Sequence, residues 1–242
     1  LNLDQRRQKD SDHHCFFVFD YREDFSLPKM IQNVKGFSRI SLEPLNATDC
    51  HEMSKHFIEE LIIPDEVVDT LLEYSKGNPF FIEEWLKSLE GNIKWSHEDI
   101  KGWTSSIPDS LNSLIISRID QLKKTDKQVL QNASVIGKKF YYDTLETLEQ
   151  KLDESSNIRE PVNELLEQSF LMKEHLKKDL YLFKNILTQQ VSYKSVLRSN
   201  RKLLHGLIAD ILENSYKDRK EEFIEDLSHH YYLSEDNAKA KE

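Results

Sequence analysis

The chain has 242 residues, of which 38% are hydrophobic and 31% are charged, so it can form one large domain or two to three small ones. Its formal net charge of −10 disfavours general binding to nucleic-acid phosphates, and its longest apolar run, residues 15–19, is too short to cross a membrane. Only six Gly and six Pro are present, which favours a mostly helical protein.

The first 43 residues contain two segments that predict strands. Residues 15–19 are continuously apolar, which is typical of a strand buried on both faces in a parallel sheet. Charged residues follow at 20–24, and the carboxyl ends of such strands are where α/β sheets bind ligands. A second short strand is predicted at 38–42, after a turn at Gly36.

Helical spacing of apolar residues begins near Thr48 and predicts three helices, followed by a polar linker at 92–106. The second and third of these helices are separated only by Gly77, Asn78 and Pro79. Glycine is favoured just past a helix end, asparagine at an N-cap and proline in a first turn. The three residues therefore predict a tight join between two helices.

Residues 105–184 show a different order of elements. A strong amphipathic helix opens at Pro108, and further helices are predicted at 125–136, 143–151 and 158–168. The apolar segments 170–172 and 180–183 follow, with a charged turn between them, and predict a β-hairpin. The last three of these helices, followed by a hairpin, have the order of a winged helix.

After Phe183 the pattern is helical again. Two apolar stripes, one within 203–212 and one starting at Phe223, predict a pair of helices. Such helix pairs are too thin to form separate cores, so they are typical of the first units of a helical repeat array.

Eight segments distributed over nearly the whole chain share their order and spacing with one family. They are Phe19 to Glu23, Gly77 to Glu84, Ile107 to Leu111, Ser117 to Leu122, Val129 to Phe140, Tyr181 to Asn185, Arg201 to His205, and His229 to Tyr232. Together they resemble the STAND class of AAA-related signalling ATPases, which occur fused to nucleotide cyclases and serine/threonine kinases and in MalT-like regulators.

The resemblance implies a fold class and four domains. The expected fold is mostly α, with a remnant of a parallel α/β NTPase core. Residues 1–43 would be the C-terminal remnant of the P-loop core and residues 44–104 a helical lid. Residues 105–184 would be a winged-helix domain, and residues 185–242 the start of a TPR-like helical repeat array.

The chain contains no G-x-x-x-x-G-K-S/T loop and no apolar strand ending in paired acids. We therefore expect no ATP hydrolysis and no bound cofactor for this chain alone, because phosphoryl transfer needs that phosphate cradle and its metal ligands. Since the chain starts at Leu1, we interpret it as a fragment of a longer ATPase. That parent would bind ATP or ADP with Mg²⁺; whether it is an active enzyme is left open.

Four residues are candidates for nucleotide binding. The resemblance implies that Arg22 senses the terminal phosphate of ATP, a role that suits a planar, permanently charged guanidinium. The alternative is a surface arginine paired with a neighbouring carboxylate. Pro79 is implied to pack on the adenine ring, with Gly77 and Asn78 holding the turn; the alternative is a simple helix stop and start.

Other kinds of site are not supported. The spacing of histidines and cysteines fits no closed metal site, and no Ser-His-Asp or Cys-His arrangement predicts a catalytic residue. The helix predicted at 158–168, which would read DNA in a winged helix, is acidic. We therefore expect no direct nucleic-acid partner.

These observations predict the regulatory part of an ATP-dependent signalling switch that couples nucleotide state to sensing. Its partners would be a protein or small inducer on the C-terminal helical repeats, and other domains of the same chain such as a cyclase or kinase, with no membrane contact. The two cysteines favour a reducing, cytoplasmic location. The alternatives are a non-catalytic helical interaction scaffold and part of a MalT-like transcription regulator.

Overall fold

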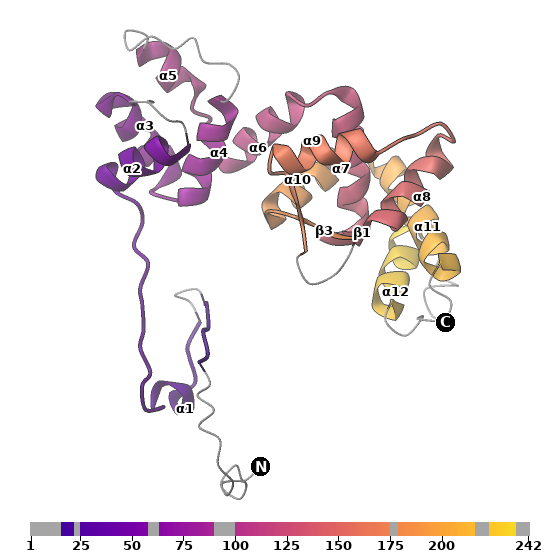
Figure 1. Cartoon of the computed structure of the whole chain (residues 1–242), viewed down its shortest axis with the longest axis horizontal. Helices are drawn as coiled ribbons and strands as arrows, with labels where there is room; N and C mark the ends of the chain where they lie inside the picture. The colour runs from indigo at the N-terminus through magenta and orange to yellow at the C-terminus, as the bar shows by residue number, and fades with distance from the viewer. Residues whose placement is uncertain are drawn as a thin grey trace, which may run out of the picture. The chain divides into compact units, whose positions relative to one another are not determined.

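The computed structural model describes residues 16–21, 25–57, 63–89, 100–174, 179–215 and 223–235, and these are mostly helical, as predicted (Figure 1). The helices are α1 (Lys29–Gln32), α2 (Ala47–Phe57), α3 (Asp65–Ser75), α4 (Pro79–Leu89), α5 (Ile100–Ser106), α6 (Leu111–Asp120), α7 (Lys124–Ile136), α8 (Tyr142–Leu152), α9 (Arg159–Glu167), α10 (Ile186–Ser195), α11 (Arg198–Ser215) and α12 (Ile224–Leu233). The strands are β1 (Lys139–Tyr141), β2 (Leu171–Lys173) and β3 (Leu180–Phe183). Two compact units divide the chain, Leu1–Glu43 and Pro44–Glu242.

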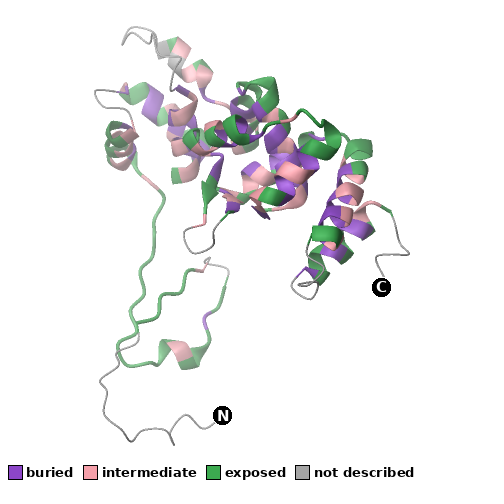
Figure 2. Cartoon of the chain, turned by 45° about the vertical axis from the view of Figure 1, so that its right-hand side comes forward, coloured by how far each residue is buried: buried purple, intermediate pink, exposed green. Residues whose placement is uncertain are grey.

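The first unit contradicts the prediction of two strands, one of them buried on both faces. Residues 16–20 and 38–42 have no regular secondary structure, and the side chains of Phe16 and Phe17 are 91% and 72% exposed (Figure 2). A strand buried on both faces needs neighbouring strands to accept its backbone hydrogen bonds and cover its side chains. The described part of this unit offers only the single-turn helix α1, so no parallel core remnant is formed there.

The first part of the second unit is a small helical cluster made by α2, α3, α4 and α5. Leu71 of α3 and Ile82, Trp85 and Leu86 of α4 are fully buried within it. The polar linker predicted at 92–106 is wrong in its last part, because α5 forms there. Trp85 Nε1 donates to Ser106 Oγ at 3.3 Å, and this tertiary contact anchors the end of α5.

Helices α6 to α9 and the three strands form a second core. The strands make an antiparallel sheet of order β1-β3-β2, with Phe140 opposite Tyr181 and Met172 opposite Leu182. The predicted hairpin is thus confirmed as β2 and β3, whereas β1 was not predicted. Strand β1 is only three residues long, and its backbone hydrogen bonds to β3 stabilise it there.

The C-terminal helices α11 and α12 bury their apolar stripes against each other and against the preceding helices. Their cluster includes Ile208, Leu227 and Tyr231, together with Val135 of α7 and Leu148 of α8. A TPR-like array therefore stays a prediction, since these helices share a core with what precedes them. None of the helices in the described ranges combines the length and apolarity that crossing a membrane requires.

Candidate functional site

The segment Gly77-Asn78-Pro79 joins α3 to α4 as the sequence predicts. Helix α3 is capped by Lys76 in the left-handed conformation (φ 52°), and Gly77 follows with φ +69°. The carbonyl oxygen of Gly77 accepts a 2.9 Å hydrogen bond from the backbone nitrogen of Leu45. A Cβ on Gly77 would stand 2.6 Å from the carbonyl oxygen of Leu45, so only glycine fits this crossing of two backbones.

Asn78 and Pro79 start α4. The Asn78 side-chain oxygen accepts a 2.9 Å hydrogen bond from the backbone nitrogen of Phe80, which satisfies one of the free donors of the first turn. Pro79 is the first helical residue, where its missing N–H costs nothing. Both residues are exposed while Gly77 is buried, so the turn presents an amide and an apolar ring on a rigid support.

The structure describes only part of the predicted nucleotide site. Arg22, the predicted phosphate sensor, lies outside the described residues. Its approach to Pro79 therefore stays a prediction.

Helix α4 carries a buried charge five residues after Pro79. Glu84 is 3% exposed and forms an ion pair with Arg118 of α6, which is 7% exposed. Arg118 Nη2 also donates to the carbonyl oxygen of Gln168, just after α9, at 2.8 Å. Its guanidinium lies 4.5 Å from the ring centroid of Phe170. One side chain thus connects α4, the end of α9 and the start of the hairpin.

A second set of ion pairs, centred on Glu83, lies beside the pair between Glu84 and Arg118. Glu83 Oε1 lies 2.5 Å from Lys87 Nζ and 3.0 Å from Lys184 Nζ, and Lys184 directly follows β3. Burial tends to raise the pKa of Glu83, but the hydrogen bonds from Lys87 and Lys184 outweigh it and lower that pKa. Burial tends to lower the pKa of Lys184, but the hydrogen bond to Glu83 outweighs burial and raises that pKa. Both groups therefore stay charged at neutral pH.

We call these five side chains (Glu83, Glu84, Lys87, Arg118 and Lys184) the hinge network. Burying ions is costly unless each is paired, so the network favours one relative placement of α4, α6 and the hairpin. Sequence reasoning missed it as a site. The available signal was Arg118, a charge within an apolar helical stripe, but its distant partner could not be read from spacing.

A third polar arrangement connects the C-terminal helices. Tyr193 Oη lies 3.0 Å from His205 Nε2, and His205 Nδ1 lies 2.7 Å from His230 Nδ1. His230 also bonds the backbone of Ile136. If His230 donates to that carbonyl, it accepts from His205, which in turn accepts from the Tyr193 hydroxyl. Burial, reinforced by neighbouring positive charge, lowers the pKa of His205 to about 4 and that of His230 to about 3.

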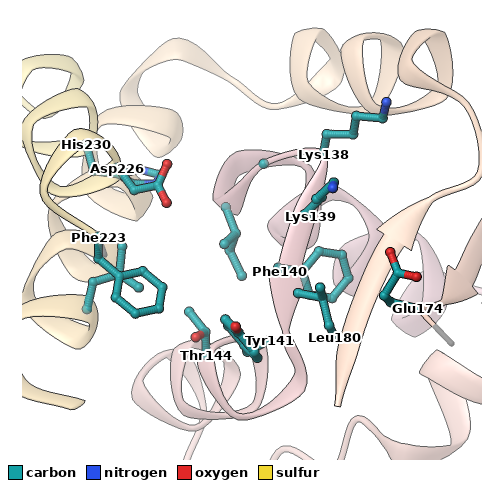
Figure 3. Close-up of a pocket in the computed structure, with 13 residues that line it drawn as sticks. Lys138, Lys139, Phe140, Tyr141, Thr144, Glu174, Leu180, Phe223, Asp226 and His230 are labelled. Carbon is teal, nitrogen blue, oxygen red and sulfur yellow. The ribbon is translucent and has the colours of Figure 1, made fainter. Parts of the chain in front are cut away.

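His230 is one of the residues that line a cavity of about 520 Å³ between β1 and the C-terminal helices (Figure 3). Phe223, the N-cap of α12, and Asp226 of α12 face it from one side and Tyr141 from the other. Burial at this wall raises the pKa of Asp226. The cavity has room for a small molecule. Within the described ranges, no group of three or more His, Cys, Asp or Glu side chains is placed to hold a metal ion.

Comparisons with known proteins leave the family open. No family model matches the chain, and no solved structure matches it. An uncharacterized protein of Rhizobium meliloti (strain 1021) is 27% identical over 180 residues. The match takes in 69% of this chain but 16% of that protein, so the chain spans about a sixth of the length of the relative.

Proposed function

We propose that this chain is the regulatory part of an ATP-dependent signalling switch of the STAND type. In this proposal, nucleotide in the intact protein is read by Arg22 and by the turn Gly77-Asn78-Pro79, and α4 transmits its state to the domain at residues 105–184. ATP or ADP with Mg²⁺ would be held mainly by a P-loop core outside this chain.

The single observation that carries the proposal is the position of two features on one short helix. Helix α4 starts at the exposed Asn78-Pro79 turn and carries Glu83 and Glu84 of the hinge network. Glu84 is five residues after Pro79, which is about 7.5 Å along a helix axis. A ligand that displaces the turn would therefore move Glu83 and Glu84 relative to their partners, because no flexible segment lies between the turn and these residues.

Buried ion pairs suit a switch because they resist gradual deformation. Stretching the pair between Glu84 and Arg118 leaves two charges in a dry environment, so intermediate positions are unfavourable. The charges would be paired in a closed arrangement and solvated in an open one, and a free-energy barrier would separate the two. A nucleotide that binds one arrangement more tightly would shift the population toward it.

The domain at 105–184 supports the assignment through its topology. The order α7-β1-α8-α9-β2-β3, with sheet order β1-β3-β2, is compatible with the proposed winged helix. Its third helix, α9, exposes Glu160 and Glu167 beside Arg159. A helix with this charge is a poor partner for a DNA groove, which favours an internal regulatory role.

The first test is to read the coding sequence upstream of Leu1. A glycine-rich loop ending in Gly-Lys-Ser/Thr, followed by an apolar strand ending in paired acids, would support an ATPase parent. In that parent, Arg22→Ala should weaken ATP binding more than ADP binding, and Pro79→Ala should weaken both alike. Titration with fluorescent ATP and ADP analogues measures this, and unchanged affinities in both variants would contradict the proposal.

A second candidate, a helical protein-interaction scaffold, is favoured by one observation. The first unit exposes large apolar side chains that a partner could cover, including Phe16, Val18, Ile40 and Leu42. Absence of both nucleotide motifs upstream would favour this scaffold. A basic helix-turn-helix encoded downstream of Glu242 would instead favour a MalT-like transcription regulator.

A further inference from the structure

Helices α10, α11 and α12 line a hollow of about 480 Å³ whose wall carries three cations. Arg198, Arg201 and Lys202 all come from the first five residues of α11. Because the chain has a formal net charge of −10, such a concentration of positive charge on one cavity contrasts with the rest of the molecule. The positive end of the 18-residue helix dipole adds to it.

The charges of this hollow are only partly neutralised. Lys202 forms an ion pair with Glu235, and the hydrogen bond from Lys202 is the main reason that the pKa of Glu235 is lowered. Neither Arg198 nor Arg201 has a carboxylate within ion-pair distance in the residues that the structure describes. Glu235 is near enough to Arg198 for the arginine charge also to lower its pKa, but among the described residues neither arginine forms an ion pair.

Arg201 is held ready for a ligand. Its guanidinium lies 4.7 Å from the ring centroid of Tyr193, and Tyr193 is itself fixed by the 3.0 Å contact of its hydroxyl with His205. The Nε of Arg201 is buried and has no hydrogen-bond partner in the described part of the chain. An anion in the hollow would therefore bind Arg201 through the terminal Nη groups of its guanidinium, which carry the other four N–H donors.

We propose that this hollow binds a small phosphomonoester, with its phosphate on Arg198 and Arg201 and its organic part against Tyr232. A phosphomonoester carries about −1.5 to −2 charges near neutral pH, which matches the two guanidiniums that form no ion pair in the described part of the chain, whereas a carboxylate would neutralise only one. The ring of Tyr232 is 66% exposed at the rim and offers an apolar face. The site is separate from the Gly77-Asn78-Pro79 turn and does not depend on the nucleotide switch.

Isothermal titration calorimetry of the 242-residue chain tests this proposal with two probes, phenyl phosphate and benzoate. Both have the same ring, and they differ in the charge and geometry of the anionic group. We expect phenyl phosphate to bind about tenfold more tightly than benzoate, because it engages one more charged hydrogen-bonding group. Equal affinity for the two probes, or no binding of phenyl phosphate, would overturn the assignment.

Three variants locate the site. Arg201→Gln and Arg198→Gln should each weaken phenyl phosphate binding by about tenfold or more. Lys151→Gln removes an exposed cation on α8 and should leave the affinity unchanged. Arg198 is exposed, so its variant keeps the test valid even where Arg201→Gln lowers the melting temperature. Unchanged binding in the Arg198 variant, or equal weakening in the Lys151 variant, would contradict the proposed site.

Discussion

Two apolar runs of four residues have opposite environments in this molecule. Residues 16–19, Phe-Phe-Val-Phe, form no strand, and each side chain is at least 58% exposed. Residues 180–183, Leu-Tyr-Leu-Phe, form β3, and Phe183 is 1% exposed. Both runs have the composition of a buried strand, so composition does not explain the difference.

The difference lies in the neighbours of each run. Strand β3 has a partner on each side, β1 and β2, which satisfy its backbone groups in both directions. The helices of the same core cover its side chains. The run at 16–19 has no strand partner among the described residues of its unit. Apolar side chains stabilise a fold only when another surface removes them from water.

The largest expected effect comes from replacing one phenylalanine by alanine in each of the two runs. Phe183→Ala should lower the free energy of unfolding by about 3–5 kcal/mol, because it leaves a cavity in a packed core. Phe17→Ala, at a 72% exposed position, should change it by less than about 0.5 kcal/mol. Urea denaturation followed by circular dichroism measures both. A comparable loss for Phe17→Ala would mean that this run is buried in solution.

Charges allow the same comparison between a buried and an exposed site. Arg118→Ala should cost about 3–5 kcal/mol, since it leaves the buried Glu84 carboxylate with only the longer 3.5 Å contact to Lys87. Lys127→Ala breaks the exposed pair with Asp120, which is 2.6 Å long, and should cost less than about 1 kcal/mol. Adding Glu84→Gln to Arg118→Ala should recover part of the loss. Failure to recover any of it would show that Arg118 acts mainly through packing.

Alanine substitution at two glycines with positive φ distinguishes the cost of backbone strain from the cost of a steric clash. Gly77→Ala should cost about 2–3 kcal/mol, because strain of about 1–2 kcal/mol is joined by a clash with the backbone of Leu45. Gly36→Ala, with φ +89° and open space around it, should cost only the strain. Melting temperatures of the two variants give the difference. Equal costs would place Leu45 farther from Gly77 than the structure does.

The smallest expected effect is a pH dependence between pH 7 and 6. The folded pKa values of His205 and His230, about 4 and 3, lie below the usual 6.5, so the unfolded chain binds protons that the folded chain does not. Stability should therefore fall as pH drops below about 6.5, by less than about 1 kcal/mol per histidine over this unit. The loss should continue until the folded pKa values are reached.

Denaturation curves at several pH values measure this slope. His205→Gln should make the slope shallower, whereas His56→Gln, at an exposed position on α2, should leave it unchanged. A slope that is the same in all three proteins would mean that His205 is protonated alike in the folded and unfolded chains.

Prediction from the sequence succeeded where the relevant interactions are local. Gly77, Asn78 and Pro79 each have a preferred backbone conformation, and together they give the observed join. The hairpin at β2 and β3 was predicted for the same reason, from two apolar runs and a charged turn. Three of the four candidate nucleotide-binding residues, Gly77, Asn78 and Pro79, lie in the described chain. Arg22 lies outside it, so the nucleotide site as a whole stays a prediction.

The sequence by itself determined the helical class of the chain, the turn at Gly77-Asn78-Pro79 and the hairpin, since propensity and periodicity act over a few residues. Only the tertiary structure decided that residues 16–19 stay exposed, that α5 forms on Trp85, and that Glu84 pairs with Arg118. The physical reason is that burial and charge pairing depend on contacts between distant parts of the chain, which local sequence patterns do not predict.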